Sequence, residues 1–358
     1  MSFGPSPHSA SAWTVVLASQ YTESPTRRSN LFPRVLHRRY RSESPKRPLS
    51  TAVAKCAAWT APDGERTNRV EHKTMVSRSR RLRHKIMRTS VRVPLIWLRH
   101  RGLDSDDVFL ASYPRSGNTW TRFLLTEILS EESASFDNIN QVIPEMGIHA
   151  RAKVKLPNGG RLIKTHEPYR KEYRRAVYLI RDFRDVVLSQ YARERELGLY
   201  QTEFGEYLEA YLDGRMSGFG AWQDHLPTWL DSPLAQSGNL LIIRFEEMRK
   251  NPEPSISRIV DFLGLPVDQN RVRAAIANNS VERMRAKENA AQKLPKSTGE
   301  EGRFVRQGAV AGWRERFTDE QLKLVDQRAG KVLVRAWYPL AFPTEEFAGL
   351  AAVERTAS

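Results

Sequence analysis

The stretch "SYPRSGNTW" at residues 112–120 decides the fold, because it joins an apolar run to an amphipathic segment through a glycine turn. The run "VFLA" precedes it and "TRFLLTEIL" follows. This order predicts a buried strand, a tight turn permitted by Gly117, and a helix capped by Asn118 or Thr119. The inner face of that helix is expected to carry Trp120, Phe123, Leu124 and Ile128.

Such a turn is suited to binding an anion. Free backbone N–H groups at the helix start, with the hydroxyls of Ser116 and Thr119, form a cradle for phosphate or sulfate. The triphosphate loop G-x-x-x-x-G-K-[ST] does not match, because Gly117 is followed by Asn118 rather than lysine and is preceded by Arg115. Taken alone, the nonapeptide is equally compatible with a plain strand-to-helix turn.

Further apolar runs repeat the order of strand followed by helix. The strand candidates are residues 107–112, 161–165, 176–181 and 239–245. In "NPEPSISRIVDFLGLP", Asn251 is expected as N-cap, Pro252 as first helical residue and Gly264 just past the end. The pattern predicts an α/β protein with a P-loop-like three-layer fold, in which helices flank a central parallel sheet. Ligands are then expected at the carboxyl ends of the strands.

The positive charge lies in the N-terminal part of the chain. The formal net charge is +16, but residues 1–100 hold 20 Lys and Arg against 5 Asp and Glu, and the remainder holds 37 against 36. The first part mixes serine, proline and arginine without periodicity, which predicts disorder. It is either a phosphate-seeking arm or an extension without function, with Met75 or Met87 as the natural start. The near-neutral remainder argues against a nucleic-acid partner.

Membrane and redox signals are weak. No apolar stretch is long enough to span a bilayer, and residues 91–100 offer at most a peripheral membrane contact. The single cysteine, Cys56, excludes an intramolecular disulfide and favours a reducing compartment. A cytoplasmic location is therefore predicted.

A second strand-to-helix junction, "AVYLIRDFRDVVLSQY", offers another anion site. Arg181 ends the strand, Asp182 or Asp185 begins the helix, and Ser189 follows two turns in. Arg181 and Ser189 can face one anion, through charge-assisted hydrogen bonds of about 1.5 to 3 kcal/mol each. Arg184 is expected instead to be a surface arginine paired with Asp182 or Asp185.

The stretch "RLIKTHEPYR" places a cation beside a base. Lys164 and His166 are two residues apart, so they point to the same side of an extended chain. A lone histidine is more often structural, but this one stands beside a lysine at a strand end and favours proton transfer.

Together these stretches resemble the motifs of cytosolic-type sulfotransferases, which use 3′-phosphoadenosine 5′-phosphosulfate (PAPS). "YPRSGNTW" resembles their 5′-phosphosulfate loop, "YLIRDFRDVVLSQY" their 3′-phosphate motif, and "FVRQGAVAGW" their C-terminal cofactor-covering loop. The resemblance implies a sulfotransferase domain at residues 101–345, between a basic extension at 1–100 and a tail at 346–358. The implied reaction moves a sulfuryl group from PAPS to an acceptor hydroxyl or amine by in-line displacement, without a metal.

The resemblance also assigns the site residues by position. The residues implied for the 5′-phosphosulfate are Arg115, Ser116, Gly117, Asn118 and Thr119. Those implied for the 3′-phosphate are Arg181, Ser189, Arg306, Gln307 and Gly308. Those implied near the adenine are Trp120, Phe245, Ser280 and Val281. The implied catalytic set is His166 as general base, Lys164 as a charge on the sulfuryl group, and Arg115.

Several positions depart from the family pattern. Arg115 stands where better-known members have lysine; it keeps the charge and can bind two oxygens, but does not readily donate a proton. Phe245 and Gln307 replace a tyrosine and a lysine, which predicts weaker cofactor binding. The familiar dimer is not implied, because the residues at its motif do not match: Arg314, Thr318, Asp319 and Lys323.

The acceptor is expected to be a small molecule or a glycan. Residues 135–154 and 197–222 are long enough to be lids, and the second segment is aromatic: Tyr200, Phe204, Tyr207, Tyr211, Phe219 and Trp222. Such rings suit a phenol, a sterol or a sugar, although about half are expected in the core. Two alternatives stay open, a kinase-like phosphotransferase, which lacks its usual lysine, and an inactive nucleotide-binding protein.

Overall fold

The computed structural model describes residues 102–147, 149, 151–291 and 310–344, together with 94 and 98. The predicted site residues Arg306, Gln307 and Gly308 lie outside the described residues, as do nearly all of the basic extension and the C-terminal tail. Of the helices that the structure describes, none is both long and apolar enough to cross a membrane.

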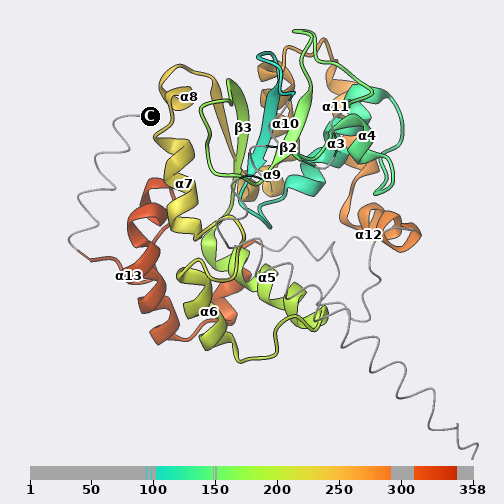
Figure 1. Cartoon of the computed structure of the whole chain (residues 1–358). Coiled ribbons are helices and arrows are strands. Elements are labelled where there is room, and N and C mark those ends of the chain that lie inside the picture. Colours follow the sequence, from blue (N-terminus) through green and yellow to red (C-terminus); the bar gives the residue numbers. More distant parts are fainter. Residues whose placement is uncertain are drawn as a thin grey trace, which may run out of the picture. The chain divides into compact units, whose positions relative to one another are not determined.

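Four strands form one parallel sheet in the order β2-β1-β3-β4 (Figure 1). They are β1 (Val108–Ser112), β2 (Leu162–Thr165), β3 (Arg175–Ile180) and β4 (Leu240–Arg244). The central strand β1 pairs Ala111 with Thr165 on one side and with Tyr178 on the other. All four predicted strands are confirmed, with ends that differ by one residue at most.

Helices lie between β1 and β2 and between β3 and β4, and further helices follow β4. The α-helices are α3 (Asn118–Ser130), α4 (Ile139–Val142), α5 (Phe183–Glu196), α6 (Phe204–Leu212), α7 (Trp222–Leu230), α8 (Pro233–Gln236), α9 (Phe245–Lys250), α10 (Pro252–Phe262), α11 (Gln269–Asn278), α12 (Val281–Ala290) and α13 (Asp319–Arg335). A 3₁₀ turn, η1, spans Gly312–Glu315.

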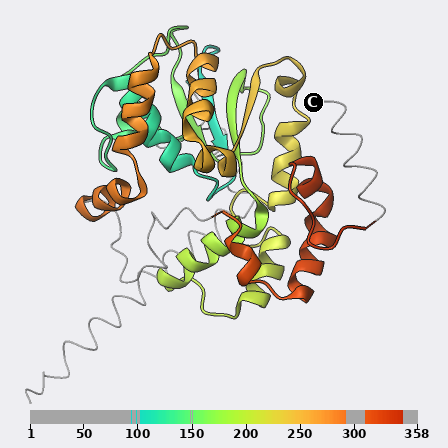
Figure 2. The ribbon, with the colours of Figure 1, turned by 180° about the vertical axis from the view of Figure 1, so that it is seen from behind.

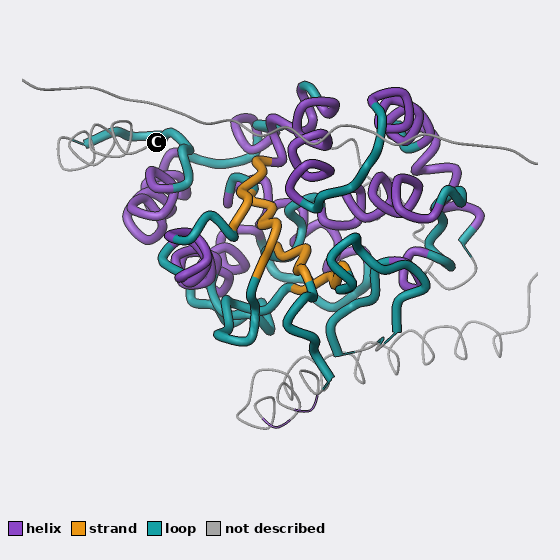
Figure 3. Tube along the Cα trace, turned by 90° about the horizontal axis from the view of Figure 1, so that it is seen from above, coloured by secondary structure: helices purple, strands orange, loops and turns teal. Residues whose placement is uncertain are grey.

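The two faces of the sheet pack against different helices, which confirms the three-layer fold. Phe109 and Ala111 of β1 belong to a core cluster with residues of α5, α6, α7 and α13. The alternate residues Val108 and Leu110 belong to a second cluster with residues of α3, α9, α10 and α11. Figures 1 and 2 show these helix groups on opposite sides of the sheet, and Figure 3 shows the strands between them. Burial on both faces explains why the strands are continuous apolar runs.

The start of α3 differs from the prediction. Its N-cap is Gly117, in the left-handed region at φ 90°, and Asn118 is already the first helical residue. The cap expected from Asn118 or Thr119 is therefore wrong. The reason is that the Asn118 amide turns back to β1, where it donates to the Leu110 carbonyl and to the Ser112 hydroxyl at 3.1 Å each. Helix α10, by contrast, begins at Pro252 after Asn251, as predicted.

Candidate active site

The predicted functional residues follow the carboxyl ends of the strands. Because the strands are parallel, these ends lie at one edge of the sheet. The strand order reverses between β1 and β3, and ligands usually bind at the carboxyl ends beside such a reversal. The residues that come directly after the four strands, or within three positions of them, are Arg115, His166, Arg181 and Phe245. The fold thus brings together residues up to 130 positions apart in the chain.

The loop after β1 has the backbone shape of an anion cradle. Arg115 and Gly117 are both left-handed, at φ 70° and φ 90°, and such turns direct successive N–H groups toward one point. A Cβ atom at Gly117 would lie only 2.4 Å from Cδ2 of Phe245. Position 117 therefore requires glycine for its φ angle and also for the closeness of the ring.

Ser116 carries a buried hydroxyl inside this loop. The residue is 1% exposed, and its Oγ has no hydrogen-bond partner within the described structure. Buried polar atoms are nearly always paired, so an unpaired one in a cradle fits a ligand that supplies the partner. A phosphate or sulfuryl oxygen has the required chemistry.

The two predicted anion sites are in contact. The Nε of Arg115 donates to the Ser189 hydroxyl at 2.9 Å, and Nη1 of Arg181 donates to the Arg115 carbonyl at 3.0 Å. The Arg181 guanidinium also lies over the Phe245 ring, 4.4 Å from its centroid, and 4.0 Å from Asp185. Arg115 after β1, Arg181 after β3 and Ser189 of α5 are therefore linked by hydrogen bonds.

Arg184 differs from the prediction in its burial. It pairs with Asp182 at 2.6 Å, as expected, but its side chain is fully buried rather than on the surface. The reason is that its guanidinium stacks on the Trp313 ring, 3.7 Å from the centroid. The Ala311 N–H also donates to Asp185 at 2.9 Å. These contacts hold η1 against the start of α5. The motif that resembles the cofactor-covering loop, residues 304–313, ends inside η1.

Three of the four residues predicted near the adenine meet where α3 approaches the α11–α12 corner. The indole N–H of Trp120 donates to the Asn279 carbonyl at 2.9 Å. Ser280, the next residue, is the N-cap of α12, and Val281 is the first residue of that helix. The fourth, Phe245, contacts Gly117 and Arg181.

His166 is held in one tautomer. Its Nδ1 lies 2.8 Å from the Ser112 carbonyl oxygen, and because a carbonyl only accepts, Nδ1 carries the proton. In the neutral ring, Nε2 then has the free lone pair. Burial, followed by the charge of Lys164, holds the pKa of His166 well below its ordinary value of 6.5. The ring is therefore neutral at neutral pH and able to accept a proton at Nε2.

Lys164 forms an ion pair that the sequence did not predict. Its Nζ lies 2.6 Å from Oε1 of Glu145, and the two residues also form a parallel bridge beside β2. Burial lowers the pKa of Lys164, whereas the Glu145 carboxylate raises it. Nothing in the local sequence marks Glu145, because residues 135–154 read only as a possible lid.

Arg122 adds a second buried cation near Glu145. Its Nη2 donates to the Ile143 carbonyl at 2.5 Å and to Asn140 Oδ1 at 2.7 Å. Burial lowers the pKa of Arg122 to about 10, and the Glu145 charge opposes this shift. With Lys164, the group holds two positive charges against one negative charge. Arg122 and Lys164 together therefore hold the pKa of Glu145 below its ordinary value, against the effect of burial.

The aromatic rings of residues 197–222 lie partly in the core and partly at the site. Tyr207, Tyr211 and Trp222 are buried in the core, as expected for about half of the rings. Phe219 is only partly buried and packs edge-on against His166, with ring centroids 5.6 Å apart. Phe219 is thus the ring of this segment that lies nearest the proposed base. Within the described ranges, no group of three or more His, Cys, Asp or Glu residues could hold a metal ion.

The strand order and the helices on both faces define a P-loop-like α/β fold. The chain belongs to the sulfotransferase family, because the model of the sulfotransferase domain matches residues 105–335. It is therefore a sulfotransferase, which decides against the kinase-like alternative.

Curated relatives are named sulfotransferases, and a solved structure shares the fold. A flavonol sulfotransferase-like protein of Flaveria bidentis is 27% identical over 255 residues, covering 63% of this chain and 80% of its own. The amine sulfotransferase of Oryctolagus cuniculus is 28% identical over 242 residues, covering 62% and 79%. A retinol dehydratase structure in a complex with retinol and PAP has a TM-score of 0.53 at 21% identity, covering 70% and 88%, and shares the fold.

Proposed function

We propose that PAPS binds along the carboxyl edge of the sheet. The 5′-phosphosulfate lies in the loop of Arg115, Ser116 and Gly117, with Asn118 and Thr119 at the start of α3. The 3′-phosphate lies at Arg181 and Ser189. Two observations support this placement: the unpaired buried hydroxyl of Ser116, and the contacts that join Arg115 to both Arg181 and Ser189.

His166 is the general base in this proposal. The hydroxyl or amine of the acceptor gives its proton to Nε2 of His166, while the acceptor oxygen or nitrogen forms a bond to sulfur. The bond between sulfur and the bridging phosphate oxygen breaks, and adenosine 3′,5′-bisphosphate (PAP) leaves. A positioned base typically contributes about 10²- to 10⁴-fold in rate. The observation that carries the proposal is the Nδ1–H donation to Ser112, because it leaves Nε2 as the acceptor.

Lys164 and Arg115 supply positive charge for the transfer. Charge develops on the sulfuryl oxygens and on the leaving phosphate, and fixed cations stabilise it. We propose that these side chains serve in place of a metal ion, so that turnover continues in EDTA. Loss of activity in EDTA that returns with Mg²⁺ would contradict this point.

The acceptor is proposed to be a small molecule with a hydroxyl or amine. Phe219 beside His166 offers an apolar ring for its body. Among similar proteins, one is named an amine sulfotransferase and another is bound to retinol, so the family name alone does not choose the acceptor.

The first test is calorimetric titration of the full chain with PAP, with adenosine 5′-monophosphate as control. Tight binding that requires the 3′-phosphate is the expected result. Equal binding of the two nucleotides would contradict the role of Arg181 and Ser189. A screen of phenols, sterols and amines with PAPS then identifies the acceptor, and the product is detected by mass.

A further inference from the structure

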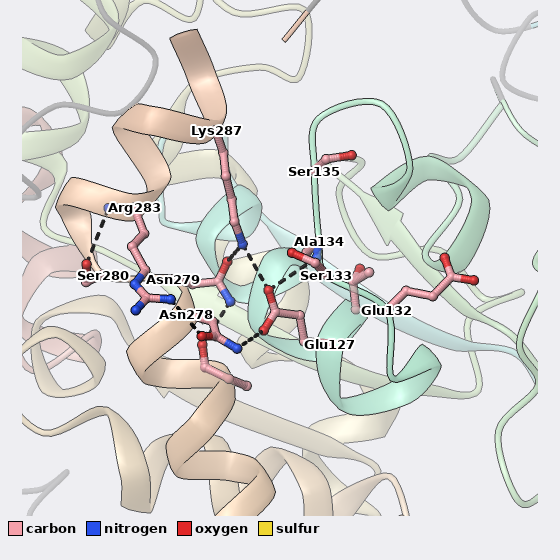
Figure 4. A network of polar contacts seen from close by, with 12 residues as sticks. Glu127, Glu132, Ser133, Ala134, Ser135, Asn278, Asn279, Ser280, Arg283 and Lys287 are labelled. Carbon is pink, nitrogen blue, oxygen red and sulfur yellow. Dashed lines mark hydrogen bonds and ion pairs between the residues drawn. The ribbon is translucent and has the colours of Figure 1, made fainter. Parts of the chain in front are cut away.

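A polar network, buried at Glu127 and Asn279, joins α3 to the α11–α12 corner (Figure 4). Its centre is Glu127, whose side chain is 8% exposed. Oε1 accepts from Lys287 Nζ at 2.9 Å and from the Ala134 N–H at 3.2 Å, and Oε2 accepts from Asn278 Nδ2 at 3.1 Å. Both carboxylate oxygens are therefore satisfied, and the buried charge is paired.

Asn279 connects this network to the nucleotide end of the proposed site. The residue is 1% exposed, and its Oδ1 accepts from Lys287 Nζ at 2.7 Å. Its Nδ2 donates to the Ala275 carbonyl at 2.8 Å, and its own carbonyl accepts from the Trp120 indole. Ser280 follows directly and caps α12. Two of the four residues predicted near the adenine, Trp120 and Ser280, thus meet at Asn279.

The spacing along α3 reinforces this connection. Trp120 and Glu127 are seven residues apart, so they lie on the same helix face two turns apart. Phe123 lies between them, and Lys287 Nζ is 5.5 Å from its ring centroid. Glu127, Lys287 and Asn279 therefore hold the same face of α3 that presents Trp120.

We propose that Glu127 is a positioning residue for the nucleotide end of PAPS, acting through Lys287 and Asn279. It takes no part in sulfuryl transfer. Its charge holds the Lys287 ammonium, which orients Asn279, and Asn279 fixes Trp120 and Ser280 relative to each other. The inference rests on the proposed PAPS site and adds a determinant of donor affinity.

The test compares two ligands on the full chain. PAP carries the adenine, whereas ribose 3,5-bisphosphate carries only the sugar and phosphates. Glu127→Gln and Lys287→Met should each weaken PAP binding by about tenfold, as expected when one contact to the adenine is lost. Each should also raise the KM for PAPS. Binding of ribose 3,5-bisphosphate and kcat should stay within about twofold of wild type.

Glu131→Gln is the matched control. Glu131 lies one turn beyond Glu127 and also pairs across to α11, with Arg271 at 2.7 Å, but this pair is exposed. The control should bind both ligands as wild type does. Should a single variant fail to fold, the double variant Glu127→Leu/Lys287→Met replaces both buried charges by apolar groups, which proteins often tolerate. The double variant should also bind PAP more weakly than wild type while its binding of ribose 3,5-bisphosphate is unchanged.

Two results overturn the inference. One is unchanged PAP binding in both the single and double variants. The other is an equal loss for PAP and ribose 3,5-bisphosphate, which would indicate general disruption of the fold. Either result is distinct from failure of the PAPS site itself, because in that case the wild-type chain would not bind PAP.

Discussion

The Nε of Arg115 donates to the hydroxyl of Ser189 across 2.9 Å, although the two residues are 74 positions apart in the chain. The contact joins the loop after β1 to the helix after β3. Arg181 completes the link by donating to the Arg115 carbonyl. Arg115 therefore belongs to both halves of the proposed donor site, rather than to the sulfuryl end alone.

Loss of the Arg115 side chain should weaken PAP binding. Arg115→Ala is expected to reduce affinity by about tenfold or more, because a charge-assisted contact is lost. The affinity of Arg115→Lys for PAP should lie between those of the wild type and Arg115→Ala, since lysine keeps the charge but not the planar fork. Calorimetry measures all three affinities. Wild-type affinity in the alanine variant would exclude Arg115 from the donor site.

Replacement of His166 should lower kcat without changing the affinity for PAP. His166→Ala is expected to lower kcat by about 10²- to 10⁴-fold, because no group remains to take the acceptor proton. PAP binding should stay close to wild type, as His166 is not among the proposed donor contacts. Single-turnover assays with PAPS and calorimetry with PAP give the two quantities. Full turnover in this variant would remove His166 from its assigned role.

His166 should also make stability depend on pH. Its pKa in the folded chain is held below 6.5, so at lower pH the unfolded ring binds a proton that the folded ring does not. The stability contributed by this group is present above pH 6.5 and is lost as the pH falls, by at most about 1.4 kcal/mol per unit. In urea unfolding at pH 7, 6 and 5, His166→Asn should lose less stability than wild type. Parallel slopes would contradict a neutral His166 ring in the folded chain.

Glu145 should stabilise Lys164. Glu145→Gln removes the only carboxylate that the described structure pairs with this lysine, at a cost of about 1 to 3 kcal/mol in the free energy of unfolding. A double-mutant cycle with Lys164→Met isolates the pair from other effects. Additive losses in the cycle would show that the two charges do not interact. In Glu145→Gln the pKa of Lys164 should also be lower than in the wild type, because the carboxylate no longer raises it. As the pH is raised, kcat should therefore begin to fall at a lower pH.

Much of the architecture could be predicted because it depends on local pattern. The apolar runs predicted all four strands, and their parallel order predicted that Arg181, His166 and the Arg115 loop would meet at one edge. These residues follow strand ends directly. No contact between distant residues had to be known to place them.

The parts that were not predicted depend on long-range pairing. Glu145 reaches Lys164 only because residues 144–146 pair with β2, and local sequence does not specify that pairing. Arg184 is buried because Trp313, far along the chain, covers it. The α3 cap failed for a similar reason, since the Asn118 amide bonds to β1 rather than to its own helix.

The approach of Gly117 to Phe245 limits how this sequence can change over time. A methyl group at position 117 would collide with the ring, and the same ring supports the guanidinium of Arg181. A substitution at one of the three positions therefore has to be accommodated at the other two. They are expected to vary as a group among descendants of this chain, and a Phe245 replacement that makes room at 117 would deprive Arg181 of its support.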